Sequence, residues 1–141
     1  MTGQDIYDGA LRMIAETGEA GTTEDYEERA PYLLGAFLSE NALLDRAYRQ
    51  ATELGIQGSF SGAFLELTET FPFCDRFVYA AECYLSSMLI LDENPEMADK
   101  LYDRYSCSLA SIREELPAKQ AAMLPDAGMY VLEDIIDRYV V

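Results

Sequence analysis

The 141-residue sequence contains no histidine and only three cysteines. Without histidine it lacks the commonest general base, the usual zinc ligand and the Glu-x-x-His motif of four-helix di-iron sites. Cys74, Cys83 and Cys107 show no C-x-x-C spacing. Their odd number, without a secretion signal, predicts reduced and buried thiols. We therefore expect no cofactor, no metal site and no disulfide.

Positive charge is also scarce, because ten Lys and Arg residues stand against 26 Asp and Glu residues, a formal net charge of −16. Phosphate binding needs clustered basic residues, so tight nucleic-acid binding is not expected. An acidic surface keeps a protein soluble, meets a basic partner, or faces DNA that it must not grip.

Long apolar runs are missing, since none reaches 18 residues, which predicts no membrane span. The N-terminal stretch MTGQDIYDGA is polar and acidic, so we expect no signal peptide. The protein is accordingly expected to be soluble and intracellular.

Apolar residues, half of the chain, recur at helical spacing and predict an all-α fold, a small helical bundle. Thr2 is placed to cap a first helix that carries Ile14 near its end. Residues 16–23 (ETGEAGTT) predict a loop. A second helix is expected from about Glu24, where Pro31 either bends the helix or delays its start.

The helical period continues from Asn41 to Leu54, either as an extension of the second helix or as a separate one, and Gly55 is expected to end it. Residues 55–62 (GIQGSFSG) are rich in glycine and serine and predict a mobile loop. Phe60 in this loop is expected to be exposed and to contact a neighbouring subunit.

Residues 77–91 are apolar on nearly every side, which predicts a central, buried helix. Pro72 sets up the turn before this helix, and Asp75 is its expected N-cap. Glu82, its charged interior residue, is expected to reach solvent or an interface.

A last clear helix is predicted by Asn94 as the cap and Pro95 at the first position, and Pro117 closes it. Its buried face includes Leu109 or Ser108. The turn before Asn94 is short, so the two helices should form an antiparallel hairpin.

The predicted bundle spans residues 1–117, and residues 118–141 form an extended C-terminal tail. Its VLEDIIDRYVV segment fits neither a helical nor a strand pattern cleanly. Apolar residues there need a cover, which is either a partner subunit or the chain's own core. We expect four of them to make inter-subunit contacts: Val131, Ile135, Ile136 and Tyr139.

Enzyme chemistry finds little support in the sequence. Residues 92–103 (DENPEMADKLYD) offer alternating oxygen ligands, but they lack the glycine and the final glutamate of a calcium-binding EF-hand loop. Two acidic pairs, Glu24 with Glu27 and Glu96 with Asp99, resemble the two magnesium-binding motifs of all-helical nucleotide pyrophosphatases. The gap between the two pairs is far longer than in that family. We expect neither an enzyme nor a small-molecule substrate.

The order of four segments is familiar: DIYDGALRMIAE, DYEERAPYLLGAFLSE, LELTETFPFCDRF and AAECYLSSMLILDENPEMADKLYDRYSCSL. This pattern resembles the small helical head–tail connector (adaptor, or head-completion) proteins of tailed phages and of Gram-positive prophages. The resemblance covers most of residues 4–116 and carries no catalytic signature.

Membership of that family would imply a ring of identical subunits below the portal, which contacts portal or tail proteins during DNA packaging and virion assembly. DNA would pass through without tight binding, because carboxylates repel phosphates. The protein would occupy the cytoplasm of the bacterial host and then the virion.

An acidic inhibitor that imitates DNA and binds a basic protein is the alternative. Eight acidic residues stand against two basic ones in the first thirty positions. These acids alternate with apolar residues at helical period, as on an ordinary solvated helix face.

Overall fold

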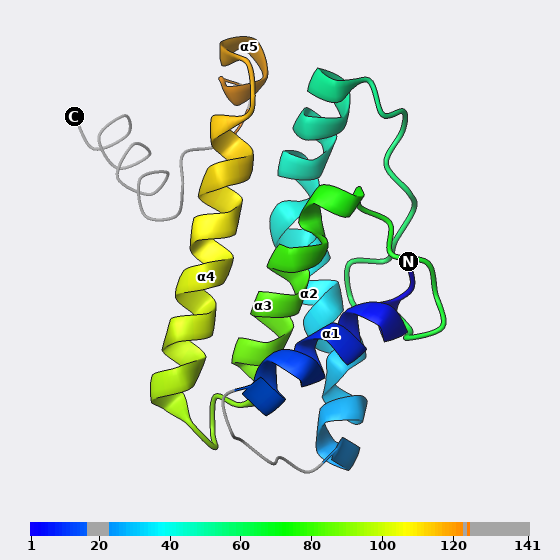
Figure 1. Ribbon diagram of the computed structural model, residues 1–141. Coiled ribbons are helices and arrows are strands. Elements are labelled where there is room, and N and C mark those ends of the chain that lie inside the picture. Colours follow the sequence, from blue (N-terminus) through cyan, green and yellow to red (C-terminus); the bar gives the residue numbers. More distant parts are fainter. Residues whose placement is uncertain (17–22, 123, 125–141) are drawn as a thin grey trace, which may run out of the picture.

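The computed structural model describes residues 1–16, 23–122 and 124, and it is built from helices (Figure 1). In chain order these are α1 (Gly3–Glu16), α2 (Thr23–Thr52), the 3-10 helix η1 (Asp75–Phe77), α3 (Val78–Leu89), α4 (Pro95–Glu114) and α5 (Ala118–Ala121). Between described residues, β pairing is limited to an isolated bridge of Thr2 with Thr70. The predicted all-α bundle is confirmed.

A reciprocal cap starts α1. The Asp5 N–H donates to Thr2 Oγ1 (3.3 Å), and the Thr2 N–H donates to Asp5 Oδ2 (2.8 Å). The carboxylate of Asp5 also accepts from the Thr2 hydroxyl, and the two bonds from the Thr2 N–H and hydroxyl lower its pKa. Ile6, Ala10 and Ile14 then form the buried stripe of the helix, as their spacing predicts.

α2 is one helix of 30 residues, so the stretch from Asn41 extends the second helix. Pro31 lies inside it and does not delay its start at Thr23. The chain after α2 returns along this helix, and the Leu65 N–H donates to Pro31 O (2.9 Å). At Gly35 the approach is so close that a Cβ atom would lie 2.6 Å from the backbone of residues 63 and 64, which explains the glycine.

The end of α2 differs from the prediction, because Glu53 and not Gly55 takes the left-handed conformation that stops the helix (φ 57°). The Leu54 N–H donates to Arg49 O (3.0 Å), the bond of a Schellman motif. Gly55 has a positive φ of its own (86°) and directs the chain onward.

α3 contacts α1, α2 and α4, and Figure 1 shows it between α2 and α4. It is the predicted central helix. The prediction that Asp75 caps this helix is wrong, because Asp75 is the first residue of η1, which runs directly into α3. The Phe77 N–H donates to Cys74 O (3.0 Å) in this turn, and no side chain caps it.

Glu82 lies half-buried between α3 and α1, rather than reaching freely into solvent. Gly9 makes room for it, since a Cβ atom at Gly9 would overlap the Glu82 carboxylate. Burial raises the pKa of Glu82, and the Arg12 guanidinium opposes this shift.

α3 and α4 form the predicted antiparallel hairpin (Figure 1). Asn94 Oδ1 accepts a hydrogen bond from the Met97 N–H (3.1 Å), and Pro95 takes the first helical position. Ser108 is buried, whereas Leu109 is only half-buried, which settles the alternative that the sequence left open.

An aromatic cluster joins this hairpin to α2. Phe37 is fully buried. Its ring centroid lies 5.9–6.3 Å from those of four others: Phe71, Phe73, Tyr84 and Tyr105. Burial raises the pKa values of Tyr105 and of Tyr84, the latter to about 12.

The three cysteines are free thiols. Cys74 and Cys83 are buried, as predicted, and burial raises the pKa of Cys74 to about 11. The prediction is wrong for Cys107, which lies exposed on the outer side of α4. The sequence alone did not show whether residue 107 lies on the buried or the exposed face of α4.

The first residues of the predicted tail form α5, which contacts α2. The tail residues expected to make inter-subunit contacts lie outside the described residues: Val131, Ile135, Ile136 and Tyr139. Among the helices of the described part, none is both long and apolar enough to cross a membrane.

A candidate interaction groove

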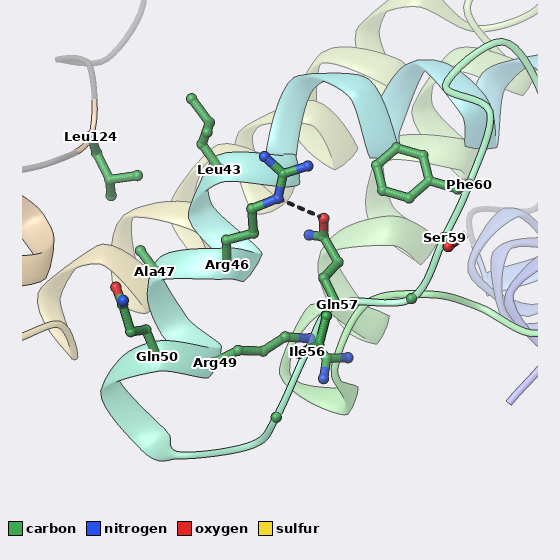
Figure 2. A pocket seen from close by; sticks show the side chains of 12 residues that line it. Leu43, Arg46, Ala47, Arg49, Gln50, Ile56, Gln57, Ser59, Phe60 and Leu124 are labelled. Carbon is green, nitrogen blue, oxygen red and sulfur yellow. Dashed lines mark hydrogen bonds between the residues drawn. The ribbon is translucent and has the colours of Figure 1, made fainter.

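A hollow lies between the C-terminal half of α2 and the segment 55–60 that follows it (Figure 2). It is an open groove with a volume of about 820 Å³. Leu124, after α5, lines its far edge. The groove thus brings two consecutive stretches, 43–50 and 55–60, together with Leu124, which is distant in sequence.

Asp45 does not line the groove, but it holds two residues that do, Arg49 and Gln57. Its side chain is completely buried, and it accepts three hydrogen bonds from three segments. Arg49 Nε (3.0 Å) and Gln57 Nε2 (2.8 Å) donate to Oδ2, and the Cys74 N–H (3.0 Å) donates to Oδ1. A buried carboxylate without such donors would be strongly unfavourable, so Asp45 fixes the segments to one another.

Gln57 holds the segment 55–60 against α2. Its Nε2 also donates to Ala42 O (3.0 Å), and its Oε1 accepts from Arg46 Nε (3.0 Å), the bond drawn in Figure 2. This side chain therefore fixes the predicted loop to α2 at three points. The mobility of residues 55–62 stays a prediction.

The outer rim of the groove is apolar and open to solvent. Of the lining residues, Ile56 is 96% exposed and Leu43 53%, and Leu54, directly before the lining residue Gly55, is 52% exposed. Scattered apolar side chains are normal on a surface, but a group of them beside a groove is typical of an interaction site. No part of the described chain covers Ile56.

Phe60, expected to be exposed, is half-buried instead. Its ring packs edge-on against Phe73, with centroids 5.7 Å apart, and it forms the inner end of the groove. The Gly- and Ser-rich sequence around it concealed this contact. Whether a neighbouring subunit also touches Phe60 stays a prediction.

Two arginines give the groove positive charge in a very acidic protein. Arg49 is paired with Asp45 and also donates to Pro72 O (3.2 Å). Arg46 is exposed and contacts the Gln57 amide. No ion pair joins Arg46 to a carboxylate of the described residues, so its charge is available to a bound group.

A shallower hollow lies on α2 nearer its start, lined by Glu28, Arg29, Tyr32 and Leu33. Arg29 Nη2 donates to Leu89 O (2.8 Å), and its Nε is paired with Asp25 (3.0 Å). The arginine therefore serves mainly to connect α2 to the end of α3.

The acidic pairs considered from the sequence form no visible metal site. Glu27 lies exposed on α2, and Glu96 and Asp99 lie exposed on α4. In the described part of the chain, no group of three or more cysteine or carboxylate side chains could hold a metal ion. Within residues 92–103, Asn94 serves as a helix cap.

Sequence inspection missed Asp45, Gln57, Arg46 and Ile56. One available signal was Asp45 on the apolar face of a helix, four residues before an arginine. Comparisons of the chain with protein-family models, with curated proteins and with solved structures each found no match.

Proposed function

We propose that the protein is a structural, non-enzymatic assembly protein, of the head–tail connector type that its sequence resembles. In this role, copies of the chain form a ring below the portal of a tailed phage or prophage and enter the virion with it. The observation that carries the proposal is the groove at the end of α2, with exposed Leu43 and Ile56 in its lining and exposed Leu54 one residue before its lining residue Gly55.

These side chains offer apolar surface, and the centre of a protein interface is more apolar than its edge. Burying a large aliphatic side chain contributes about 1.5–3 kcal/mol, so three of them offer enough to anchor a neighbour. Arg46 beside them adds orientation, because a paired charge at the rim of an interface favours one register. Phe60 and the tail residues Val131, Ile135, Ile136 and Tyr139 are the further contacts we propose.

The distribution of acidic residues suits a DNA channel. Of the carboxylates whose burial the structure describes, Asp45 is fully buried and Glu82 half-buried, whereas the others are exposed. The groove, by contrast, carries the arginines. In a ring, the grooves would face neighbouring subunits, and carboxylates on the remaining surface would face the central channel. There they would repel the phosphates of DNA and let it pass.

Mass in solution tests this proposal. We expect light scattering to show growth from monomer toward a closed ring as concentration rises, or when the portal protein is added. A chain that stays monomeric at high concentration with portal present would contradict it.

A pull-down separates the proposal from the alternative of an acidic inhibitor. The connector should capture portal or tail proteins. Capture of a basic nuclease or polymerase, without any binding of portal, would favour the inhibitor.

A further inference from the structure

The groove lies next to Leu124, the last described residue before the segment 125–141. Leu124 lines the groove and packs, half-buried, on the hydrophobic core (Figure 2). Its N–H donates to Ala121 O (3.2 Å), which connects it directly to α5, and α5 contacts α2. The last described residue, Leu124, therefore lies at the edge of the groove.

The composition of residues 125–141 matches the groove. Four carboxylates against one arginine give this segment a net charge of −3, opposite to that of Arg46. More than half of its residues are apolar, among them Val131, Leu132, Ile135 and Ile136. The groove offers an apolar rim with one cation, and the segment offers apolar side chains with carboxylates.

We infer that residues 125–141 dock into the groove of their own chain in the free protein. Their apolar side chains cover Leu54 and Ile56, and their carboxylates face Arg46. The seventeen residues reach about 26 Å as a helix and about 56 Å when extended. The groove follows α2 from Leu43 to Gln50, a rise of about 10 Å along the helix, and both lengths exceed it.

The covalent link between the segment 125–141 and the bundle favours docking into the groove of the same chain over docking into a second copy. A segment attached beside its site has an effective concentration on the order of millimolar. At micromolar protein concentration, the segment of another molecule cannot compete with it. A partner that uses the groove must therefore displace residues 125–141 first. This inference depends on the groove alone and stands whether or not the protein forms a ring.

Paramagnetic relaxation in the full-length protein tests the docking. A spin label is attached through Val141→Cys in a Cys107→Ser background, since the two remaining native thiols are buried. The methyl signal of Ile56 should then lose most of its intensity. Ile90, at the turn between α3 and α4 at the opposite end of the bundle, is the internal control (Figure 1).

Charge reversals test the recognition. Arg46→Glu should restore the Ile56 signal, whereas Lys100→Glu, an equal change on the exposed side of α4, should not. The double variant Asp134→Lys/Asp137→Lys changes only the segment 125–141 and should also restore the Ile56 signal. It leaves the groove unchanged, so the test still works if Arg46→Glu disturbs the fold. Combining these changes with Arg46→Glu should reduce the signal again.

Three results would overturn the inference. The first is an Ile56 signal that the label leaves intact in the parent protein. The second is recovery with Lys100→Glu equal to that with Arg46→Glu. The third is an equal loss when an isotope-labelled chain without the spin label is mixed with unlabelled spin-labelled chain, which would assign the contact to a second copy. A failed ring assay changes none of these measurements.

Discussion

The hairpin side of the bundle and the C-terminal end of α2 bury opposite kinds of side chain. Around Phe37, aromatic and aliphatic groups from α2, α3 and α4 fill the interior. At the end of α2 the interior holds a charged group, Asp45, and the large apolar residues Leu54 and Ile56 lie outside. The first arrangement provides stability, and the second fixes a loop while leaving apolar surface for recognition.

The two regions differ in whether the interactions that hold them depend on direction. Apolar packing is non-directional and stabilises any compact arrangement, so it suits a core. Hydrogen bonds to a buried carboxylate demand fixed geometry, so Asp45 specifies where the segment after α2 lies. The apolar side chains of this segment are therefore held in a fixed arrangement that a partner can recognise.

Phe37→Ala should have the largest effect on stability. Its fully buried ring contacts four others, and truncation leaves a cavity that costs about 3–5 kcal/mol in the free energy of unfolding. Urea denaturation followed by circular dichroism measures it. Phe64→Ala, at an exposed ring, is the matched control and should cost well under half as much.

Asp45→Asn should have the second-largest effect on stability, a loss of about 2–4 kcal/mol in the free energy of unfolding. The nearly buried Arg49 loses its counter-charge in this variant. The double variant Asp45→Asn/Arg49→Met should be less destabilised than the sum of the two single changes. A strictly additive double-mutant cycle would show that the ion pair does not fix this end of α2.

Glu82→Gln should give a smaller change that depends on pH. Burial raises the pKa of Glu82 in the folded protein, so the unfolded chain ionises first as pH rises. Relative to the Gln variant, the parent protein should thus lose stability from acid pH toward neutrality. Thermal unfolding at several pH values measures this difference, and a gap that widens toward acid pH would contradict the assigned cause.

Ile56→Asp should affect the stability of the bundle least, within about 0.5 kcal/mol, because the bundle itself leaves this side chain almost fully exposed and only the docked segment 125–141 covers it. Urea denaturation again measures it. A loss comparable to that of Asp45→Asn would mean that Ile56 belongs to the core of the free protein rather than to a surface.

Much of the fold is predictable from the sequence, because its signals are local. The caps at Thr2 and Asn94 depend on neighbours three residues away, and the apolar period marks α3 as central. The position of Glu53 at the end of α2 was not predictable, since a nearby glycine is normally preferred there.

The groove was hidden because its contacts span distant segments. Asp45 meets Cys74, and Phe60 meets Phe73, across intervals that no local pattern encodes. Exposure of Ile56 is likewise a property of the assembled fold. A Gly- and Ser-rich segment predicted mobility, while its single glutamine supplies three bonds to α2.

The central claim is that the groove end of the molecule, and not the hairpin end, carries the assembly contacts. Light scattering on three proteins tests it most directly: the parent chain, Ile56→Asp, and Leu91→Asp at the α3–α4 turn, where the leucine is 46% exposed. The account predicts that the parent and Leu91→Asp grow toward a ring with concentration, and that Ile56→Asp remains a folded monomer. Equal assembly of Ile56→Asp and the parent would contradict it.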